Sequence, residues 1–247
     1  MSAAILDAPA TLPLTQTPVP KPIPDWEWLY DAVDRIGPGQ SLSVNGANWK
    51  VYQNVMDRRD GNRPGMRIQY DRGEIEIMPT HSWHELWKTI LACLIECIAE
   101  ELSIPLSGLG GMTVSREDRD RGFEPDECYY IQNIHRVIPA PERNLDFTID
   151  PPPDLTIEIE VTSFVSKRLS IFAAFKVPEV WRYNGEHLTI LHLNSDGQYR
   201  PASMSLAFPS FPVAELNSYL AKAGTVDQTS IIREFRQWVR EHLTTKS

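Results

Sequence analysis

Residues 154–162 read DLTIEIEVT, an apolar run interrupted by two glutamates two positions apart. Because side chains alternate between the two faces of a β-strand, Glu158 and Glu160 share one face and the aliphatic residues share the other. A run this apolar is typical of a central strand, which needs a sheet around it and other elements against its faces. The acidic face is then either the solvated side of an ordinary amphipathic strand or part of a functional site.

The rest of the chain supplies helices and strands around this run. After Ser82, apolar residues recur at helical spacing, which predicts an amphipathic, core-packed helix from Ser82 to about Leu102. The other expected elements are a hairpin of strands Met66–Tyr70 and Glu74–Met78, strands Met112–Ser115, Cys128–Gln132, Leu155–Val161, Glu179–Tyr183 and Leu188–Leu193, a hairpin turn at Asp196–Gly197, and helices Val165–Lys176 and Ile231–Leu243. This order predicts an α/β fold in which a mixed β-sheet is flanked by helices.

Prolines dominate the start of the chain, with six of them among small residues in the first 24 positions. Such a segment has few backbone donors and few side chains to pack, so we expect an extended, mobile arm over residues 1–24. A short helix over residues 26–36 would follow and end at the Gly-Pro-Gly sequence after it. Residues 25–247 are expected to form a single domain, because one large core suits a chain of this length.

Composition narrows the classes of function. A net charge of -9 disfavours a protein that simply coats DNA, but not a nuclease, whose carboxylates must first collect metal ions. No run of about 20 apolar residues and no secretory signal is present, so we expect a cytoplasmic protein with no membrane partner. Cys93, Cys97 and Cys128 lack zinc-ligand spacing and are interpreted as reduced core residues.

A second acidic segment, GFEPDEC, spans residues 122–128. Proline is tolerated at the first residue of a strand, so Pro125 places Asp126 at a strand entrance. Carboxylates at the start of one strand and on a neighbouring strand can converge on a hard cation such as Mg²⁺, which makes Asp126 and Glu158 a candidate pair. Taken alone, a Pro-Asp pair is more often part of a turn.

Together these segments resemble a known superfamily. Asp126 after Pro125, then Glu158 in an apolar strand followed by a crossover helix, resembles the PD-(D/E)XK motif of restriction-endonuclease-like enzymes. More closely, YDRGEIEIMPTHSWHE, EPDECYYI, PPPDLTIEIEVTS and VPEVWRY are similar to a bacterial family of uncharacterised proteins assigned to that superfamily. The similarity covers roughly residues 66–193, and the four segments occur in the same order.

The resemblance implies a metal-dependent endonuclease that hydrolyses phosphodiester bonds of DNA. Asp126, Glu158 and the backbone carbonyl of Ile159 would bind Mg²⁺ or Mn²⁺, which stabilises charge on the phosphate. In the superfamily motif a lysine stands two residues after the acidic strand residue, and here that position is Glu160. A carboxylate there adds negative charge beside the phosphate, so either a second metal ion or a cationic side chain from elsewhere would have to compensate.

The following helix offers such a cation. Arg168 falls at the centre of that helix's apolar stripe, so its guanidinium points inward and needs an anionic partner, Glu158 or Glu160. Arg168 would then bind phosphate or form a buried ion pair that holds the helix to the sheet. Lys167, at the edge of the stripe, is the second candidate.

Two further residues are candidates for the neighbourhood of the site. His84 lies closer to the apolar stripe of its helix than Glu85 does, so His84 either reaches a neighbouring strand of the site or serves as a cap or core-edge residue. In the hairpin, Glu74 and Glu76 share the face opposite to Ile75, and either glutamate, with Glu76 preferred, could complete an acidic metal site or simply be solvated. Aromatic residues on the strands, Tyr129, Tyr130, Trp181 and Tyr183, either stack on bases or pack in the core, as strand aromatics usually do.

Three functions are therefore consistent with the sequence. The first is a Mg²⁺-dependent endonuclease acting on DNA. The second is a catalytically degenerate relative that binds nucleic acid or protein, favoured by Glu160. The third is a structural homodimer in which the acidic strand and Arg168 form a buried network.

Overall fold

The computed structural model describes Leu29 and residues 41–62, 66–79, 82–137, 144–160 and 165–244. The proline-rich arm expected over residues 1–24 and nearly all of the helix expected over residues 26–36 lie outside these ranges. None of the described helices combines the length and the apolar character that a membrane span requires.

One of two sheets, sheet A, is antiparallel with strand order β1-β3-β2-β6-β5. Its strands are β1 Leu42–Asn45, β2 Met66–Asp71, β3 Glu74–Pro79, β5 Val114–Arg116 and β6 Arg121–Phe123. Alternation places Ile68, Tyr70, Ile75 and Ile77 on one face, where helix α2 (Trp49–Asn62) covers them. The opposite face of β2 and β3 carries polar side chains that turn toward the second sheet.

The predicted hairpin is β2 and β3. Residues Met66 to Asp71 pair with Glu74 to Pro79 in antiparallel register, which confirms the sequence prediction. The two turn residues, Arg72 and Gly73, have φ values of 46° and 96°. Positive φ at both central residues is the conformation whose twist suits a two-residue hairpin, and glycine adopts it at little cost.

The second sheet, sheet B, is mixed and has strand order β11-β10-β9-β8-β7-β4. Its strands are β4 Ser107–Gly108, β7 Glu127–Tyr130, β8 Leu155–Ile159, β9 Glu179–Tyr183, β10 Leu188–Leu193 and β11 Tyr199–Ala202. Strands β8 and β9 are parallel and joined by helix α5 (Val165–Phe175), whereas the other neighbours are antiparallel. The central strand inferred from the DLTIEIEVT run is therefore β8, and all five of its residues are buried.

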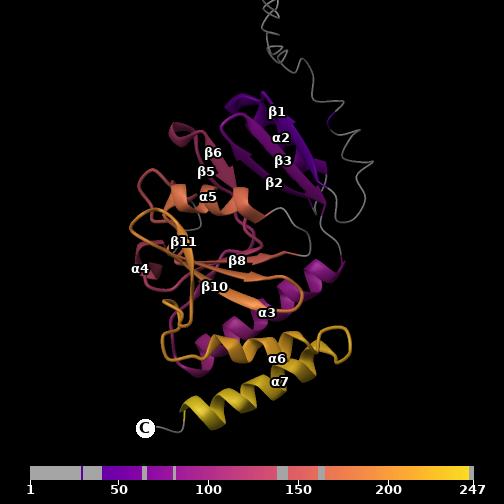
Figure 1. The fold of residues 1–247 in the computed structure, drawn as a ribbon, viewed down its shortest axis with the longest axis vertical. Coiled ribbons are helices and arrows are strands. Elements are labelled where there is room, and N and C mark those ends of the chain that lie inside the picture. Colours follow the sequence, from indigo (N-terminus) through magenta and orange to yellow (C-terminus); the bar gives the residue numbers. More distant parts are fainter. Residues whose placement is uncertain are drawn as a thin grey trace, which may run out of the picture.

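The sheets and helices form layers (Figure 1). Helix α5 lies between sheet A and sheet B, in a core with Phe123 of β6 and Val180 of β9. Helix α3 (Ser82–Glu101) covers the other face of sheet B, and helices α6 (Leu216–Leu220) and α7 (Gln228–Val239) pack outside it. The mixed sheet flanked by helices is confirmed, and the structure adds a second sheet.

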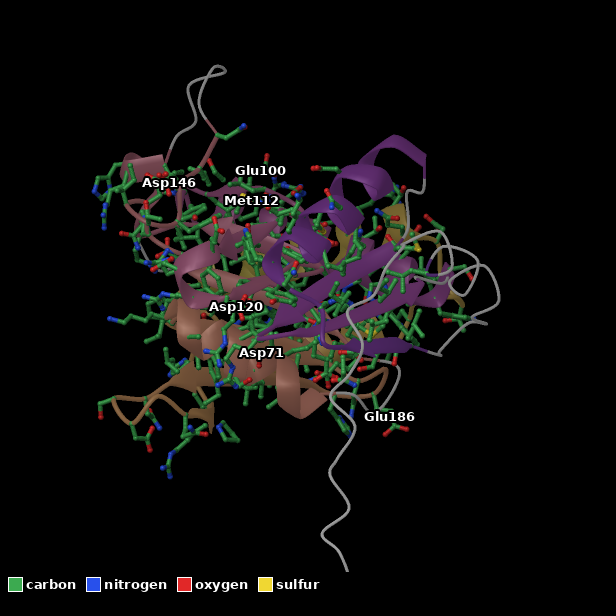
Figure 2. The ribbon with its side chains drawn as sticks, turned by 90° about the horizontal axis from the view of Figure 1, so that it is seen from above. Asp71, Glu100, Met112, Asp120, Asp146 and Glu186 are labelled. Atoms are coloured by element: carbon green, nitrogen blue, oxygen red, sulfur yellow. The ribbon has the colours of Figure 1, made fainter. Side chains whose placement is uncertain are left out.

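Figure 2 labels Asp71, the last residue of β2, and Asp120, which directly precedes β6. Asp71 and Asp120 lie close together there, because the hydroxyl of Tyr70 donates to Asp120 Oδ1 at 2.8 Å and Arg121 Nε donates to Asp71 Oδ1 at 2.8 Å. These contacts extend the short β2–β6 ladder and fix β6, which leads directly into Asp126.

Several sequence predictions differ from the structure at the ends of elements. Helix α7 begins at Gln228, three residues before the expected start, because Asp227 Oδ1 accepts from Ser230 N at 2.9 Å and caps the helix. Strand β1 and helix α2 were not expected. Helix α2 has a cap, since Asn48 Oδ1 accepts from Val51 N at 3.0 Å, but its buried residues do not extend beyond Met56 among those whose side chains are described.

The remaining elements are short. They are the 3-10 helices Glu117–Arg119 and Val213–Glu215, helix α4 (Ile134–Val137) and a π-helical turn over Arg240–Thr244.

The contact between α7 and the core gives a test of the fold. Phe235 is fully buried and packs on Phe211 and Tyr219. We expect Phe235→Ala to lower the free energy of unfolding by about 3–5 kcal/mol, because it removes a large buried side chain and leaves a cavity. Denaturant unfolding followed by circular dichroism measures this, with exposed Arg233→Ala as the matched control. Equal, small effects of both variants would contradict the placement of α7.

Candidate functional site

Asp126 and Glu158 meet where β7 begins and β8 ends. Strands β7 and β8 pair so that Glu127 is opposite Ile157, and Asp126 N donates to Ile157 O at 3.1 Å. Asp126 Oδ2 in turn accepts from the backbone N–H of Ile159 at 2.6 Å, which fixes the carboxylate over the end of β8. Glu158 points to the face opposite to Ile157, and both acidic side chains are almost fully buried.

Arg67 of β2 joins the two carboxylates. Its Nη1 lies 2.9 Å from Asp126 Oδ1, and its Nη2 donates to Glu158 Oε2 at 2.8 Å. Since Arg67 belongs to sheet A and Glu158 to sheet B, this guanidinium crosses the space between the sheets. Sequence reasoning missed Arg67, although strand alternation places it on the polar face of β2 together with Gln69.

Arg168 of α5 approaches Glu158 from the helix. Its Nη1 pairs with Glu158 Oε2, its Nε donates to Gln69 Oε1 at 3.1 Å, and its Nη2 donates to the carbonyl of Glu124 at 3.0 Å. The guanidinium of Arg168 points inward, as its position on the apolar stripe predicts. Its ion-pair partner is Glu158 and not Glu160. The side chain of Lys167, the second candidate, lies outside the described residues.

His84 in the first turn of α3 completes the contacts of Asp126. Its Nε2 lies 2.9 Å from Asp126 Oδ1, and its Nδ1 lies 3.1 Å from Glu85 Oε1. Glu85 is half-exposed and also pairs with Lys88, so it holds the ring from the solvent side. The structure therefore brings His84, and not Glu85, to Asp126.

Two more acidic side chains lie nearby. Glu76 is buried and accepts a hydrogen bond from Gln69, so the solvated alternative for this residue was wrong. Glu124 Oε1 accepts from the Thr113 hydroxyl at 2.8 Å, and its Oε2 accepts from Ile68 N at 3.3 Å, which continues the β2–β6 ladder. Glu124 was not expected from the sequence. We refer to Arg67, Glu76, His84, Glu124, Asp126, Glu158 and Arg168 as the charged cluster.

Charge in the cluster is unbalanced. Among its described members, four carboxylates stand against two guanidiniums, so formal negative charge exceeds positive charge by two when His84 is neutral. Burial alone would raise the pKa of Asp126, but Arg67 and His84 outweigh burial and lower it to about 2. For Glu158 burial outweighs Arg168 and Arg67 and raises the pKa above its usual range. An excess of buried negative charge favours binding of a cation.

Two buried polar atoms of the cluster have no hydrogen-bond partner among the described residues: Glu158 Oε1 and Arg67 Nε. A buried carboxylate oxygen without a donor is costly, and a hard divalent cation is a partner that oxygen ligands suit. Asp126 and Glu158 therefore fit such an ion in donor chemistry and charge. The described residues contain no group of three or more His, Cys, Asp or Glu side chains close enough together to hold a metal.

Glu160 lies apart from the cluster. Its carboxylate pairs with both Nε and Nη2 of Arg182 on β9, and its backbone N–H donates to Tyr183 O at 2.7 Å. The expectation that Glu160 adds unbalanced negative charge beside the phosphate is corrected, because Arg182 balances that charge. Ile159 contacts the cluster through its backbone N–H, which donates to Asp126. That the carbonyl of Ile159 binds a metal ion stays a prediction.

The aromatic residues on the strands are core residues. Tyr129, Tyr130, Trp181 and Tyr183 are all buried, which favours the packing alternative over base stacking. Of the three cysteines, Cys97 and Cys128 are buried, Cys93 is partly buried, and all three are free thiols, as expected for reduced residues.

The model of the Uma2 family, described as "Putative restriction endonuclease", matches residues 53–218, which is more than half of the chain and includes the whole charged cluster. Among solved structures, the chain is similar to a protein from Anabaena variabilis described as "a putative nuclease belonging to DUF820". The TM-score is 0.42 and the identity 16%, over 70% of this chain and 90% of that one. No curated protein matches the chain.

The ion pair of Arg168 gives a test of the cluster. We expect Arg168→Gln to lower the free energy of unfolding by about 3 kcal/mol, because it leaves the buried Glu158 carboxylate short of a cation. Burial already raises the pKa of Glu158, and we expect it to rise further once Arg168 no longer stabilises the ionised form. As the pH falls, a carboxyl whose pKa is raised in the folded state is protonated there first, and its buried charge is removed. The loss of unfolding free energy in Arg168→Gln should therefore be smaller at about pH 5 than at about pH 7.

Arg200→Gln is the control, because Arg200 forms an exposed pair with Asp196 and should change stability by less than about 0.5 kcal/mol. Denaturant unfolding of both variants at the two pH values is the measurement. A deficit in Arg168→Gln that does not depend on pH would contradict an ionised Glu158 as its partner.

Proposed function

Because the chain belongs to the Uma2 family of restriction-endonuclease-like proteins, we propose that it is a divalent-metal-dependent endonuclease that hydrolyses phosphodiester bonds of DNA. The family description supports a nuclease. The observation that carries the metal dependence is the buried Oε1 of Glu158, which has no partner among the described residues and belongs to a cluster with excess negative charge.

Asp126 and Glu158 would hold Mg²⁺ or Mn²⁺, together with the carbonyl of Ile159. When bound, such an ion supplies Lewis-acid stabilisation of the negative charge that develops on the phosphate. Glu76 is within electrostatic range of Arg168 and would tune the charge of the cluster without a described contact to Asp126 or Glu158.

The chain's own residues position the two carboxylates. The N–H of Ile159 and the ring of His84 hold opposite oxygens of Asp126, which fixes its direction before any ligand arrives. Arg168 ties Glu158 to α5 and to the carbonyl of Glu124. Preorganisation of this kind is what electrostatic catalysis requires, because no side chain then has to reorganise during the reaction.

A second function is favoured by one observation. Glu160 occupies the lysine position of the motif and is paired with Arg182, so neither side chain of that pair is available to orient an attacking water. A non-catalytic relative that binds nucleic acid or protein would keep the metal site without cleavage.

A homodimer also belongs to the proposal. Met204 and Leu206 are exposed just after β11, and apolar side chains of this kind suit a contact with a second copy. Sedimentation velocity of the wild type and of Met204→Glu tests this, with a shift to the monomer expected in the variant.

Metal binding and cleavage test the nuclease proposal together. Calorimetric titration of Mn²⁺ and Mg²⁺ into the wild type should show binding, and Asp126→Asn and Glu158→Gln should weaken it by more than about 100-fold, because each removes a charged ligand. Incubation with supercoiled and single-stranded DNA and the better-bound metal should give nicking only with the wild type.

Asp196→Asn, in an exposed pair far along the chain from these ligands, is the control and should bind metal and nick DNA as the wild type does. Binding without cleavage of either DNA would favour the non-catalytic module. A wild type that binds neither metal would refute the metal site.

A further inference from the structure

Arg67 stands at the solvent edge of the charged cluster. Its side chain is 12% exposed, against 1% for Asp126 and 2% for Glu158, while its Nε is buried with the carboxylates. Arg168, by comparison, has each of its guanidinium nitrogens in a described contact with the protein.

The unpartnered atoms of the cluster have opposite requirements. Arg67 Nε is a donor without an acceptor, and Glu158 Oε1 is an acceptor without a donor, counted over the described residues. Both belong to side chains that already contact each other through Arg67 Nη2 and Glu158 Oε2. A phosphodiester accompanied by a divalent cation meets both requirements at once, since an anionic oxygen suits Arg67 and the cation suits Glu158.

Arg67 and a metal ion also depend on the same two carboxylates. The guanidinium contacts Asp126 Oδ1 and Glu158 Oε2. These are the two side chains that would hold the cation. A cation bound there competes with Arg67, and a guanidinium that loses its carboxylates needs a new anionic acceptor. Guanidinium groups bind phosphate with paired, charge-assisted hydrogen bonds.

From these contacts we infer that Arg67 is the phosphate-binding residue of the site: metal ions compete with it for Asp126 and Glu158, and it then binds a non-bridging oxygen of the scissile phosphodiester. This inference rests on the proposed nuclease function. The superfamily motif has a lysine two residues after the acidic residue of the strand, and this chain has Glu160 at that position. In this chain the positive charge would come instead from Arg67, on β2 of sheet A.

The alternative is a purely structural Arg67, which bridges sheet A and sheet B and stays on its carboxylates. The two roles differ in the sign of one effect. Removing a structural bridge disorders Asp126 and Glu158 and weakens metal binding, whereas removing a competing cation strengthens it.

The test compares Arg67→Gln with the wild type in two measurements. Calorimetry with Mn²⁺ alone should show binding about tenfold tighter in the variant, because the competing charge is gone. Fluorescence anisotropy of a short DNA duplex, titrated in Ca²⁺ at several salt concentrations and checked on a gel to be intact, should show weaker binding. The slope of log affinity against log salt should fall by about 0.9, the value for one lost phosphate contact.

Two further variants complete the test. Arg67→Lys keeps the positive charge but loses the paired contact of the guanidinium with Asp126 and Glu158, so it should retain the wild-type salt slope and bind Mn²⁺ more tightly than the wild type but less tightly than Arg67→Gln. If Arg67→Gln does not fold, the Mn²⁺ calorimetry is done with Arg67→Lys instead. Arg200→Gln removes an exposed arginine outside the cluster and should leave both measurements unchanged.

Weaker Mn²⁺ binding in both Arg67 variants, or an unchanged salt slope in Arg67→Gln, would overturn the inference while the metal-dependent nuclease stands. A wild type that binds no DNA would overturn both the inference and the proposed substrate. Loss of metal binding in Asp126→Asn is independent of either result, so the two failures can be told apart.

Discussion

The ion pairs of Glu158 hold the molecule together at the point where its layers meet. One carboxylate oxygen, Oε2, accepts from Arg67 of sheet A and from Arg168 of α5, while Glu158 itself belongs to the central strand of sheet B. Buried charges stabilise a fold only if every partner is placed well, because desolvation of each charge costs several kcal/mol. The ion pairs that join the two sheets at this point therefore also shape the candidate site.

Local features of the fold could be predicted from the sequence. The β2–β3 hairpin, α3 and strands β9 and β10 follow from alternation, helical spacing and turn residues, all of which act over a few positions. The division into two sheets could not be predicted, because it depends on which strands pair across long separations. Strand β1 shows this: it joins sheet A through β3, some thirty residues away, and has only four residues of its own.

The candidate site was predicted in part, and the omissions have one cause. Asp126, Glu158, His84 and Arg168 carry local signals, namely a strand entrance, an acidic pair in an apolar strand and positions on a helical stripe. Arg67 lies 91 positions from Glu158, and alternation gives the face of β2 on which it lies but not its partner. Glu160 was misjudged for the same reason, since its partner Arg182 comes from the next strand of the sheet.

The position of the charged cluster between the sheets has a consequence for how relatives of this chain diverge. A lineage that no longer cuts nucleic acid would still be expected to keep Glu158 and Arg168, because loss of either one leaves the other charge buried without its partner. Selection for foldability alone would preserve these residues long after an activity had decayed. Their presence in a relative therefore indicates a shared fold. Whether the relative also catalyses the reaction has to be judged from residues that do not contribute to the stability of the fold.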